Sequence, residues 1–341
     1  MISIIKKTKA AILTKTKKPL VIDTIFFPKK LEKGQIIIKM IYSGVCGSQL
    51  GEIDAVKGKD KYLPHLLGHE GIGEVIQKGP LVKKVKKGDI VLLHWMPSNG
   101  INSASPKFSW NKKILNAGCV TTFSDYTIVS ENRVTKIKKK SNLLNTLLLG
   151  CTASTAIGSV EKLCDIKKTN NVIVAGCGPI GLYIIKYLNY LNIKNIIALD
   201  ISNQKLELAK KFGAKKLIFN LKKNKIKNID YFFECTGNNF VISDGYNTLN
   251  YNGTMIFIGV PNYKKKSCFN TLGINLGKKL IGSKGGNFKA NIDLKKYLKI
   301  VNKSKLRSNN FVTKIIKLEK INSIFDLMRK NKTVGKIIIK F

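Results

Sequence analysis

Residues 171–181 read NVIVAGCGPIG, a short apolar run that leads directly into glycines with the spacing G-x-G-x-x-G. The run has the length and β-branched content of a buried strand, and the apolar stretch 182–191 behind the glycines is typical of a helix. A second strand-like run, residues 195–199, ends at Asp200, which follows Gly181 by 19 residues. A strand, a glycine turn, a helix and a second strand that ends in an acidic residue together predict a parallel βαβ unit.

The glycines of this unit each have a physical role in binding a dinucleotide. Gly176 permits a tight turn, Gly178 lets the backbone approach a pyrophosphate, and Gly181 permits close packing of the helix on the strand. The helix N-terminus adds N–H groups and a positive dipole end for the phosphates. A glycine turn without a ligand fits less well, because strand, turn, helix and acidic residue all occur in the required order.

Asp200 indicates which dinucleotide is bound. A carboxylate at this position accepts hydrogen bonds from the hydroxyls of the adenine ribose and repels a 2′-phosphate. We therefore expect NAD rather than NADP, with a preference that Lys205 and the positive charge of the chain weaken.

The regions before and after residue 150 differ in pattern. The first contains short β runs separated by Gly and Lys, which predict a small all-β barrel or sandwich; the clearest are residues 35–41, 71–76, 89–93 and 125–129. From about residue 171 strands alternate with helices, as in a parallel α/β sheet. Further elements expected there are a helix at 204–212 and strands at 216–219, 230–234 and 254–260. The last run, 334–341, is strand-like and is expected to rejoin the first region.

The composition is that of a globular protein with a strong excess of lysine. The chain has 341 residues, a length that is enough for two domains, and 44% of its residues are apolar. Lys and Arg number 61 against 20 Asp and Glu, a formal net charge of +41. Only three of the basic residues are arginines and the lysines are spread along the chain, whereas nucleic-acid surfaces favour clustered arginine. We expect no nucleic-acid partner.

Cysteine usage and hydropathy bear on location. Seven widely spaced cysteines, an odd number, do not resemble a disulfide framework and are expected to be reduced thiols. No run of 18 or more apolar residues occurs, and residues 1–14 lack the continuous apolar stretch of a signal peptide. We therefore expect no membrane partner and a cytoplasmic location.

Three residues form a candidate metal site. Cys46 lies in the stretch SGVCGS, His69 follows 23 residues later in GHE, and Cys151 begins CTAST. Two thiolates and an imidazole suit Zn²⁺, and three protein ligands with an open fourth position are typical of a catalytic zinc. The residues alone leave a second interpretation open, because a buried cysteine is commonly just a small apolar residue.

The motifs together resemble the zinc-dependent alcohol dehydrogenases of the medium-chain dehydrogenase/reductase superfamily. The resemblance is carried by residues 44–48, 68–73, 87–91, 122–126, 150–155 and 176–181, by Asp200 and by the ending near Gly335. It implies an α/β fold in which a GroES-like β-rich catalytic domain joins a Rossmann domain with a doubly wound parallel sheet. The implied boundaries are 1–152, completed by 287–341, for the catalytic domain and 153–286 for the NAD-binding domain, with the active site in the cleft between them.

The resemblance also implies roles for individual residues. Cys46, His69 and Cys151 match the ligands of one catalytic zinc per chain. Ser48 matches the hydroxyl that relays the substrate proton, Glu70 the acidic residue behind the metal, and Trp95 an aromatic residue of the substrate pocket. The matching coenzyme residues are Thr155, Gly176, Gly178, Pro179, Ile180, Gly181, Asp200, Lys205, Ile258 and Val260. The zinc polarises the substrate oxygen, and hydride passes to C4 of the nicotinamide.

The sequence departs from this family at several positions. Gln49 replaces an aspartate that orients the zinc-bound histidine, so the basicity of that ligand is expected to be lower. Gly51 replaces the histidine that ends the proton relay, so protons must leave by another path. Gly47 and Gly335 replace arginines at the pyrophosphate, and weaker coenzyme binding is expected unless lysines such as Lys336 compensate.

A further departure concerns a second, structural zinc. Many relatives hold it in four closely spaced cysteines, but residues 92–118 contain none, and Cys119 alone cannot form a tetrahedral site. We expect aromatic burial of Trp95, Phe108 and Trp110 to hold this segment, and one zinc per chain.

The leading hypothesis is an oxidoreductase that transfers hydride between NAD(H) and an alcohol or polyol, or the corresponding aldehyde or ketone. The alternatives are a zinc-free quinone or enoyl reductase of the same superfamily, and a non-enzymatic protein that binds a dinucleotide or nucleic acid. The resemblance implies a homodimer or homotetramer. The loops expected to shape the substrate pocket, 51–61, 93–114 and 283–291, do not reveal the substrate.

Overall fold

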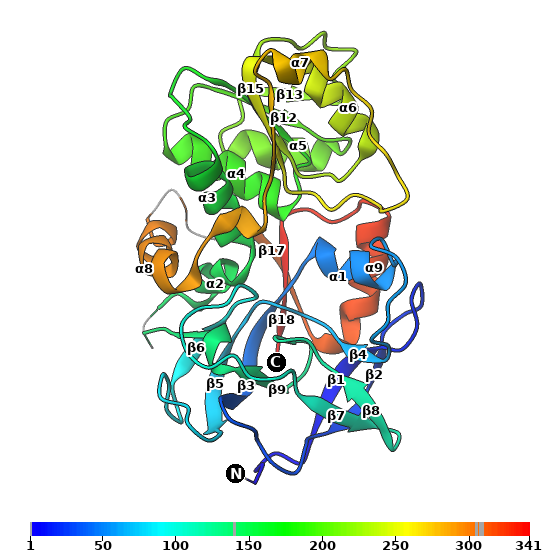
Figure 1. Cartoon of the computed structure of the whole chain (residues 1–341), viewed down its shortest axis with the longest axis vertical. Coiled ribbons are helices and arrows are strands. Elements are labelled where there is room, and N and C mark those ends of the chain that lie inside the picture. The colour runs from blue at the N-terminus through cyan, green and yellow to red at the C-terminus, as the bar shows by residue number, and fades with distance from the viewer. Residues whose placement is uncertain (1, 139–140, 304–305, 307–309) are drawn as a thin grey trace.

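The computed structural model describes residues 2–138, 141–303, 306 and 310–341. Figure 1 shows a part with a helix-covered sheet at the top and a part rich in β-strands at the bottom. The strands of the described residues form three sheets: one of six parallel strands, one mixed sheet of seven strands, and a closed barrel of five. This is the predicted combination of a parallel α/β sheet with a β-rich region.

The parallel sheet has the strand order β13-β12-β11-β14-β15-β16. In chain order this is 3-2-1-4-5-6, the arrangement of a doubly wound dinucleotide-binding fold. The strands are β11 (Asn171–Ala175), β12 (Asn195–Leu199), β13 (Lys216–Ile218), β14 (Ile229–Glu234), β15 (Leu249–Phe257) and β16 (Lys279–Gly282). The strands predicted at 171–175 and 195–199 are confirmed without a shift, whereas the one predicted at 254–260 begins and ends earlier.

Helices cover both faces of this sheet because β11 is apolar on both. Val172 and Val174 share a core with residues of α3 and α4, while Ile173 and Ala175 share another with residues of α6. This alternation follows from the period of two along a strand. The helices of this part are α3 (Thr152–Leu163), α4 (Pro179–Tyr190), α5 (Asn203–Lys211), α6 (Asn239–Thr248) and α7 (Leu272–Asn275).

The β-rich part combines the barrel with the mixed sheet. The barrel consists of β1 (Lys7–Leu13), β2 (Val21–Phe26), β4 (His65–Leu66), β7 (Lys107–Trp110) and β8 (Lys113–Asn116). The mixed sheet consists of β3 (Gln35–Val45), β5 (Gly71–Lys78), β6 (Ile90–Leu93), β9 (Tyr126–Ser130), β10 (Val134–Lys136), β17 (Val312–Ile316) and β18 (Lys336–Lys340). The segment 93–114, expected as a loop, contains strand β7 and the first residues of strand β8.

The C-terminal strand completes the β-rich part, as predicted for residues 334–341. In an antiparallel pairing, Ile337 of β18 lies opposite Val45 at the end of β3. The remaining helices are α1 (Gly47–Ile53), α2 (Leu143–Leu147), α8 (Ala290–Val301) and α9 (Ile321–Arg329). Short 3₁₀ turns occupy Glu131–Arg133, Leu148–Gly150, Gly285–Asn287 and Leu318–Lys320. Helices α1 and α9 contact each other, and Figure 1 shows them at the right.

The segment 92–118 is packed in the way its aromatic residues suggest. Phe108 is buried and its ring meets that of Phe27 edge-on, with 5.1 Å between centroids. Trp110 is half-buried and its indole N–H donates to Asp23 Oδ2 over 2.8 Å. Both contacts lie inside the barrel part, so β7 is held by aromatic packing and a polar anchor.

No single helix among the described residues has the length and apolarity to cross a membrane. One bent pair, Leu143–Gly150 with Thr152–Leu163, passes on length and composition, with 62° between its parts. The first nine residues of its second helix are buried in the protein core.

Candidate functional site

Cys46, His69 and Cys151 come together from three separate segments of the chain. Cys46 follows β3 and precedes α1, His69 lies between β4 and β5, and Cys151 immediately precedes α3. The Sγ atoms of the two cysteines and a ring nitrogen of His69 all lie within 4.8 Å of one another. Among the described residues this is the one group of three or more His, Cys, Asp or Glu residues close enough to hold a metal ion.

The chemistry of the cluster fits zinc. His69 Nε2 is buried and has no hydrogen-bond partner among the described residues, as expected for an atom reserved for a metal. A hydrogen bond from the Cys151 thiol, with His69 and Lys336 nearby, holds the pKa of Cys46 well below its usual range. The same hydrogen bond, together with burial, raises the pKa of Cys151. Two sulfurs and one nitrogen are a donor set that Zn²⁺ accepts, with one position left open.

Gln49 contacts the other ring nitrogen of His69, at the position where the sequence departs from the family. Its side chain is buried; Oε1 accepts the Cys46 N–H over 2.8 Å, and Nε2 lies against His69 Nδ1. A metal on Nε2 requires the proton on Nδ1, so two donors then face each other. The single carbonyl oxygen of Gln49 can accept from the Cys46 N–H or from the protonated Nδ1 of His69, but not from both. A carboxylate at this position would have an oxygen for each donor.

Glu70 and Lys336 form a buried ion pair behind the cluster. Both side chains are fully buried, and the Lys336 ammonium also donates to Thr152 Oγ1 over 3.0 Å. Burial lowers the pKa of Lys336, but the negative charges of Glu70, Cys46 and Cys151 outweigh it and the pKa is raised. Lys336 is thus committed to Glu70 and is not a free cation for a pyrophosphate, which corrects the expectation drawn from its position beside Gly335.

Two of the motif glycines, Gly44 and Gly150, make room for the Glu70 side chain. A Cβ on Gly44 would lie 2.5 Å from Glu70 Oε1, and one on Gly150 would lie 2.6 Å from Glu70 Cβ. Neither distance leaves room for a side chain. The glycines of SGVCGS and LLGCTA therefore allow the Glu70 side chain to lie between β3 and the turn before α3.

Ser48 and Trp95 are the residues expected in the reaction site; the Trp95 backbone N–H donates to the carbonyl of Gly150, next to Cys151, over 3.4 Å. Ser48 is in the first turn of α1, with Oγ 3.5 Å from His69 Nδ1, at the limit of a hydrogen bond. Trp95 Nε1 is buried without a partner among the described residues, and a Cβ on Gly285 would lie 2.4 Å from its ring. Gly285 belongs to the turn after β16, so Trp95 packs between the two parts of the protein.

The glycine turn between β11 and α4 has the geometry that the spacing predicts. Gly176 has φ of +90°, which a residue with a side chain rarely adopts. A Cβ on Gly181 would lie 2.0 Å from the Gly176 carbonyl oxygen, whereas one on Gly178 would meet nothing within 4 Å. Gly178 thus leaves open space at the N-terminus of α4, where Pro179 is the first residue and the half-buried Ile180 the second.

Asp200 is held at the end of β12 by two backbone donors. Its Oδ2 accepts the Cys177 N–H over 2.8 Å and its Oδ1 accepts the Ser202 N–H over 2.9 Å. Each carboxylate oxygen keeps lone pairs for a ribose hydroxyl. Lys205, expected nearby, donates instead to Asn331 Oδ1 in the turn between α9 and β18.

Thr155 connects the metal cluster to the coenzyme part. Its N–H donates to the Cys151 carbonyl over 2.9 Å in the first turn of α3, so a predicted coenzyme residue stands one helical turn from a predicted metal ligand. The short α3 turn therefore fixes the two sites relative to each other.

Glu234 organises the far side of the coenzyme region and was missed from the sequence. It is buried at the end of β14, and its Oε1 accepts the N–H groups of Thr236 and Gly237 over 2.7 and 3.0 Å. Its carbonyl accepts the Ile258 N–H over 2.8 Å, so it also fixes the turn that carries Ile258 and the exposed Val260. The available signal was an acidic residue at the end of a buried strand, directly before Cys-Thr-Gly.

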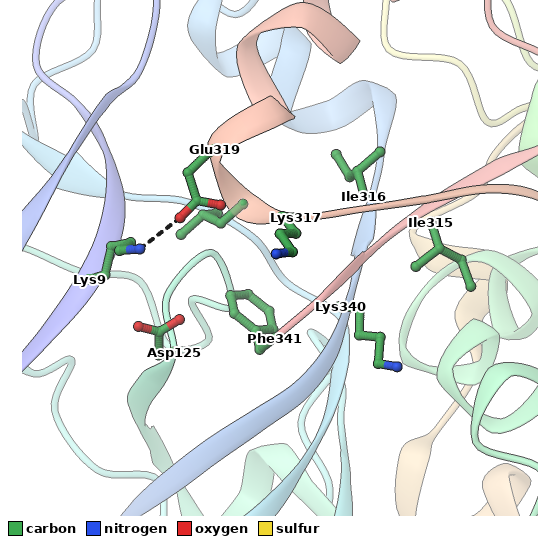
Figure 2. A pocket seen from close by; sticks show the side chains of 9 residues that line it. Lys9, Asp125, Ile315, Ile316, Lys317, Glu319, Lys340 and Phe341 are labelled. Carbon is green, nitrogen blue, oxygen red and sulfur yellow. Dashed lines mark hydrogen bonds and ion pairs between the residues drawn. The ribbon is translucent and has the colours of Figure 1, made fainter.

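A surface cavity of about 530 Å³ lies apart from these residues (Figure 2). It is lined by β17, the C-terminal residue and charged side chains, among them Lys9 and Glu319, which form an ion pair. None of the predicted site residues lines it.

Comparison with known proteins matches two family models to the two parts of the chain. Residues 32–139 match the alcohol dehydrogenase GroES-like domain, and residues 179–303 match the zinc-binding dehydrogenase family. An S-(hydroxymethyl)glutathione dehydrogenase of Escherichia coli O1:K1 is 30% identical over 97% of this chain and 99% of its own length.

Solved structures of low sequence identity share the fold. Benzyl alcohol dehydrogenase from Acinetobacter calcoaceticus superposes with a TM-score of 0.85 at 22% identity, over 98% of this chain and 99% of that one. An alcohol dehydrogenase of Escherichia coli CFT073, solved with NADH, superposes with a TM-score of 0.78 at 20% identity, over 98% and 100%.

Proposed function

The chain belongs to the zinc-dependent alcohol dehydrogenases of the medium-chain dehydrogenase/reductase superfamily, and we propose that Cys46, His69 and Cys151 hold its catalytic zinc. The protein is a zinc-dependent oxidoreductase that uses NAD and acts on an alcohol or the corresponding carbonyl compound. The observation that supports the ligand assignment is the approach of the three donor atoms within 4.8 Å, with buried His69 Nε2 lacking a partner among the described residues.

The bound groups supply the reactive chemistry: zinc acts as a Lewis acid on the substrate oxygen and the nicotinamide accepts or donates hydride. The side chains of this protein bind and orient the reacting groups. Ser48 takes the substrate proton, Trp95 closes one wall of the substrate pocket, and the ion pair with Lys336 keeps Glu70 behind the metal ligands. Gln49 lies against Nδ1 of His69, at the position where the aspartate of the family orients the ring.

For the coenzyme, we infer that the pyrophosphate lies at the N-terminus of α4. The open space at Gly178 and the positive end of a 12-residue helix support this placement. Asp200 receives the adenine ribose, and Thr155, Ile180, Ile258 and Val260 border the nicotinamide half. We also propose Lys205 as a coenzyme contact; its ammonium donates to Asn331 Oδ1. Preference for NAD over NADP follows from the Asp200 charge.

The domain division we propose is 1–152 with 287–341 for the catalytic domain and 153–286 for the coenzyme domain. The pairing of β18 with β3 supports the assignment of the C-terminal residues to the first. The proposed assembly is a homodimer or homotetramer; edge strand β16 and the exposed Leu272, Ile274 and Leu276 of the preceding α7 region support it. The proposed location is the cytoplasm, in keeping with cysteines that are free thiols wherever the structure describes them.

The intact Cys46–His69–Cys151 cluster argues against a zinc-free reductase, and the substrate we propose is an alcohol or polyol. The test is a screen of NAD reduction over primary alcohols, secondary alcohols, diols and sugar phosphates, together with elemental analysis of protein purified without chelator. We expect turnover and one zinc per chain. A folded protein without zinc and without NAD reduction would overturn the proposal, and two zinc ions per chain would show a second ligand set.

A further inference from the structure

The catalytic site proposed above needs a group that accepts the substrate proton after Ser48. Ser48 lies in the first turn of α1, and the residue three positions later, Gly51, has no side chain. A hydroxyl cannot store an additional proton, so each oxidation requires an acceptor that can exchange with solvent.

Helix α1 places a carboxylate in the required direction. Ser48 and Glu52 are four residues apart in this helix, so they lie on the same face with their Cβ atoms about 5–6 Å apart. Ser48 is half-buried beside His69, whereas Glu52 is exposed at the other end of the same helix. The face of α1 therefore leads from the metal cluster to solvent.

Glu52 is also the unengaged carboxylate of its segment. Asp54 is held by the Arg329 guanidinium at 2.8 Å, and Asp60 by His65 Nε2 at 2.7 Å. The Glu52 carboxylate has no hydrogen-bond or ion-pair partner among the residues that the structure describes, so a proton transferred to it breaks no existing contact.

The charges around Glu52 suit a group that gains and loses a proton. Although the Glu52 side chain reaches solvent, the surrounding protein partly desolvates its carboxylate and so raises its pKa, and the neighbouring Asp60 raises it further. His65, His69 and Lys57 lower the pKa but do not cancel the rise. A carboxyl with a raised pKa exchanges protons nearer to neutral pH than an ordinary glutamate does.

His65, one of the groups near Glu52, is held in a fixed orientation. Its Nε2 lies 2.7 Å from Asp60 Oδ2 and its Nδ1 lies 3.0 Å from the Leu66 carbonyl oxygen. The second Asp60 oxygen accepts the Tyr62 N–H over 2.8 Å. Both ring nitrogens of His65 thus have partners within the protein, so neither is free to be the next carrier of the proton.

We propose that Glu52 accepts the substrate proton by way of Ser48 and releases it to solvent, in place of the side chain that Gly51 lacks. In the oxidation, the substrate O–H bond breaks as its proton passes to Ser48 Oγ, and the Ser48 hydroxyl proton passes to Glu52, directly or through one water. The hydride goes to NAD, and Glu52 then loses the proton to bulk water. The balance is alcohol plus NAD⁺ to carbonyl compound, NADH and H⁺; reduction runs the same steps backwards.

The test compares Glu52→Gln with Glu52→Asp in zinc-loaded protein, using the alcohol of the panel that the wild type oxidises fastest. Because the relay requires ionised Glu52, the wild-type kcat should fall as the pH drops through the raised pKa. We expect the Gln variant to lose this limb, with kcat at least about tenfold below the wild type at neutral and alkaline pH and converging with it at acid pH. Glu52→Asp, or formate added to the Gln variant, should restore part of the rate.

Controls separate this proposal from the function on which it rests. Glu207→Gln removes an equal charge from the exposed face of α5 and should match the wild type. Zinc content and NADH binding should be unchanged in Glu52→Gln. A Gln variant within twofold of the wild type at every pH overturns the relay, and so does an equal loss at all pH values without rescue. An inactive, zinc-free wild type would instead overturn the function itself.

Discussion

The proposed coenzyme site and the proposed metal site of this protein are built in opposite ways. The coenzyme turn is one continuous stretch whose shape is set by backbone geometry. Gly176 has a positive φ, Gly181 packs against the Gly176 carbonyl, and Gly178 leaves open space. The metal cluster is assembled from side chains of segments 23 and 82 residues apart, with a second layer of Gln49, Glu70 and Lys336 behind them. Local geometry decides the first region and long-range packing the second.

This difference predicts where damage spreads. A change in the coenzyme turn should act mainly on coenzyme binding, except at Gly181, where a side chain would strike the Gly176 carbonyl and push α4 away from β11. A change in the metal cluster or the layer behind it affects β3, β5, β18 and α3 together, because these elements meet there. Mutating one region and measuring both therefore distinguishes the two.

The largest effect is expected from removing a metal ligand. Cys46→Ser or His69→Ala should abolish turnover and lower the zinc content, because two protein ligands hold zinc poorly. NADH binding, followed by fluorescence, should survive, since the coenzyme turn lies on β11 and α4. Cys268→Ser, at an exposed cysteine outside the site, is the matched control. More than a few per cent of activity in metal-free protein would refute the zinc mechanism.

The second prediction concerns the ion pair behind the cluster. Lys336→Met leaves the buried Glu70 carboxylate without its cation and should lower the free energy of unfolding by about 3–5 kcal/mol. Urea denaturation of zinc-loaded protein measures it. The double variant Lys336→Met with Glu70→Gln removes both charges and should recover much of the loss. If the single variant is as stable as the wild type, the pair does not hold this part together.

The third prediction tests the coenzyme region alone. Asp200→Gly should reduce kcat/KM for NAD by about tenfold or more, since a hydrogen bond to a charged group is worth about 1.5–3 kcal/mol, and should improve the relative use of NADP. Asp200→Asn keeps an acceptor for the Cys177 N–H and separates the loss of charge from the loss of turn support. Zinc content should not change. Equal kcat/KM values for NAD and NADP in the wild type would contradict the assignment.

The same contrast explains how much the sequence could predict. The strands 171–175 and 195–199, the turn and the role of its glycines follow from spacing, because each depends on neighbours in the chain. The residue types of Cys46, His69 and Cys151 suit a zinc site, but only the resemblance to a family favoured this over buried cysteines, since nothing in their spacing states that the segments meet.

Side-chain contacts that depend on tertiary packing could not be predicted from the sequence. Position 336 reads as a surface lysine beside Gly335, and its burial against Glu70 depends on how β18 pairs with β3. Glu234 is an ordinary strand end until the turns after β14 and β15 are seen to converge on it. Glu52 became informative only once its neighbours Asp54 and Asp60 were found to be paired elsewhere.

The smallest effect expected is a gain. Gln49 offers one oxygen to two donors, the Cys46 N–H and the protonated Nδ1 of a metal-bound His69. Gln49→Glu is isosteric and offers two oxygens, so it should satisfy both donors and raise zinc affinity by about tenfold, the lower end of what such supporting residues contribute. Gln49→Leu fills a similar volume, satisfies neither donor and should bind zinc more weakly than the wild type. Competition with a chromogenic chelator ranks the three proteins, and a folded Glu variant with unchanged or weaker affinity would show that the amide already serves both groups.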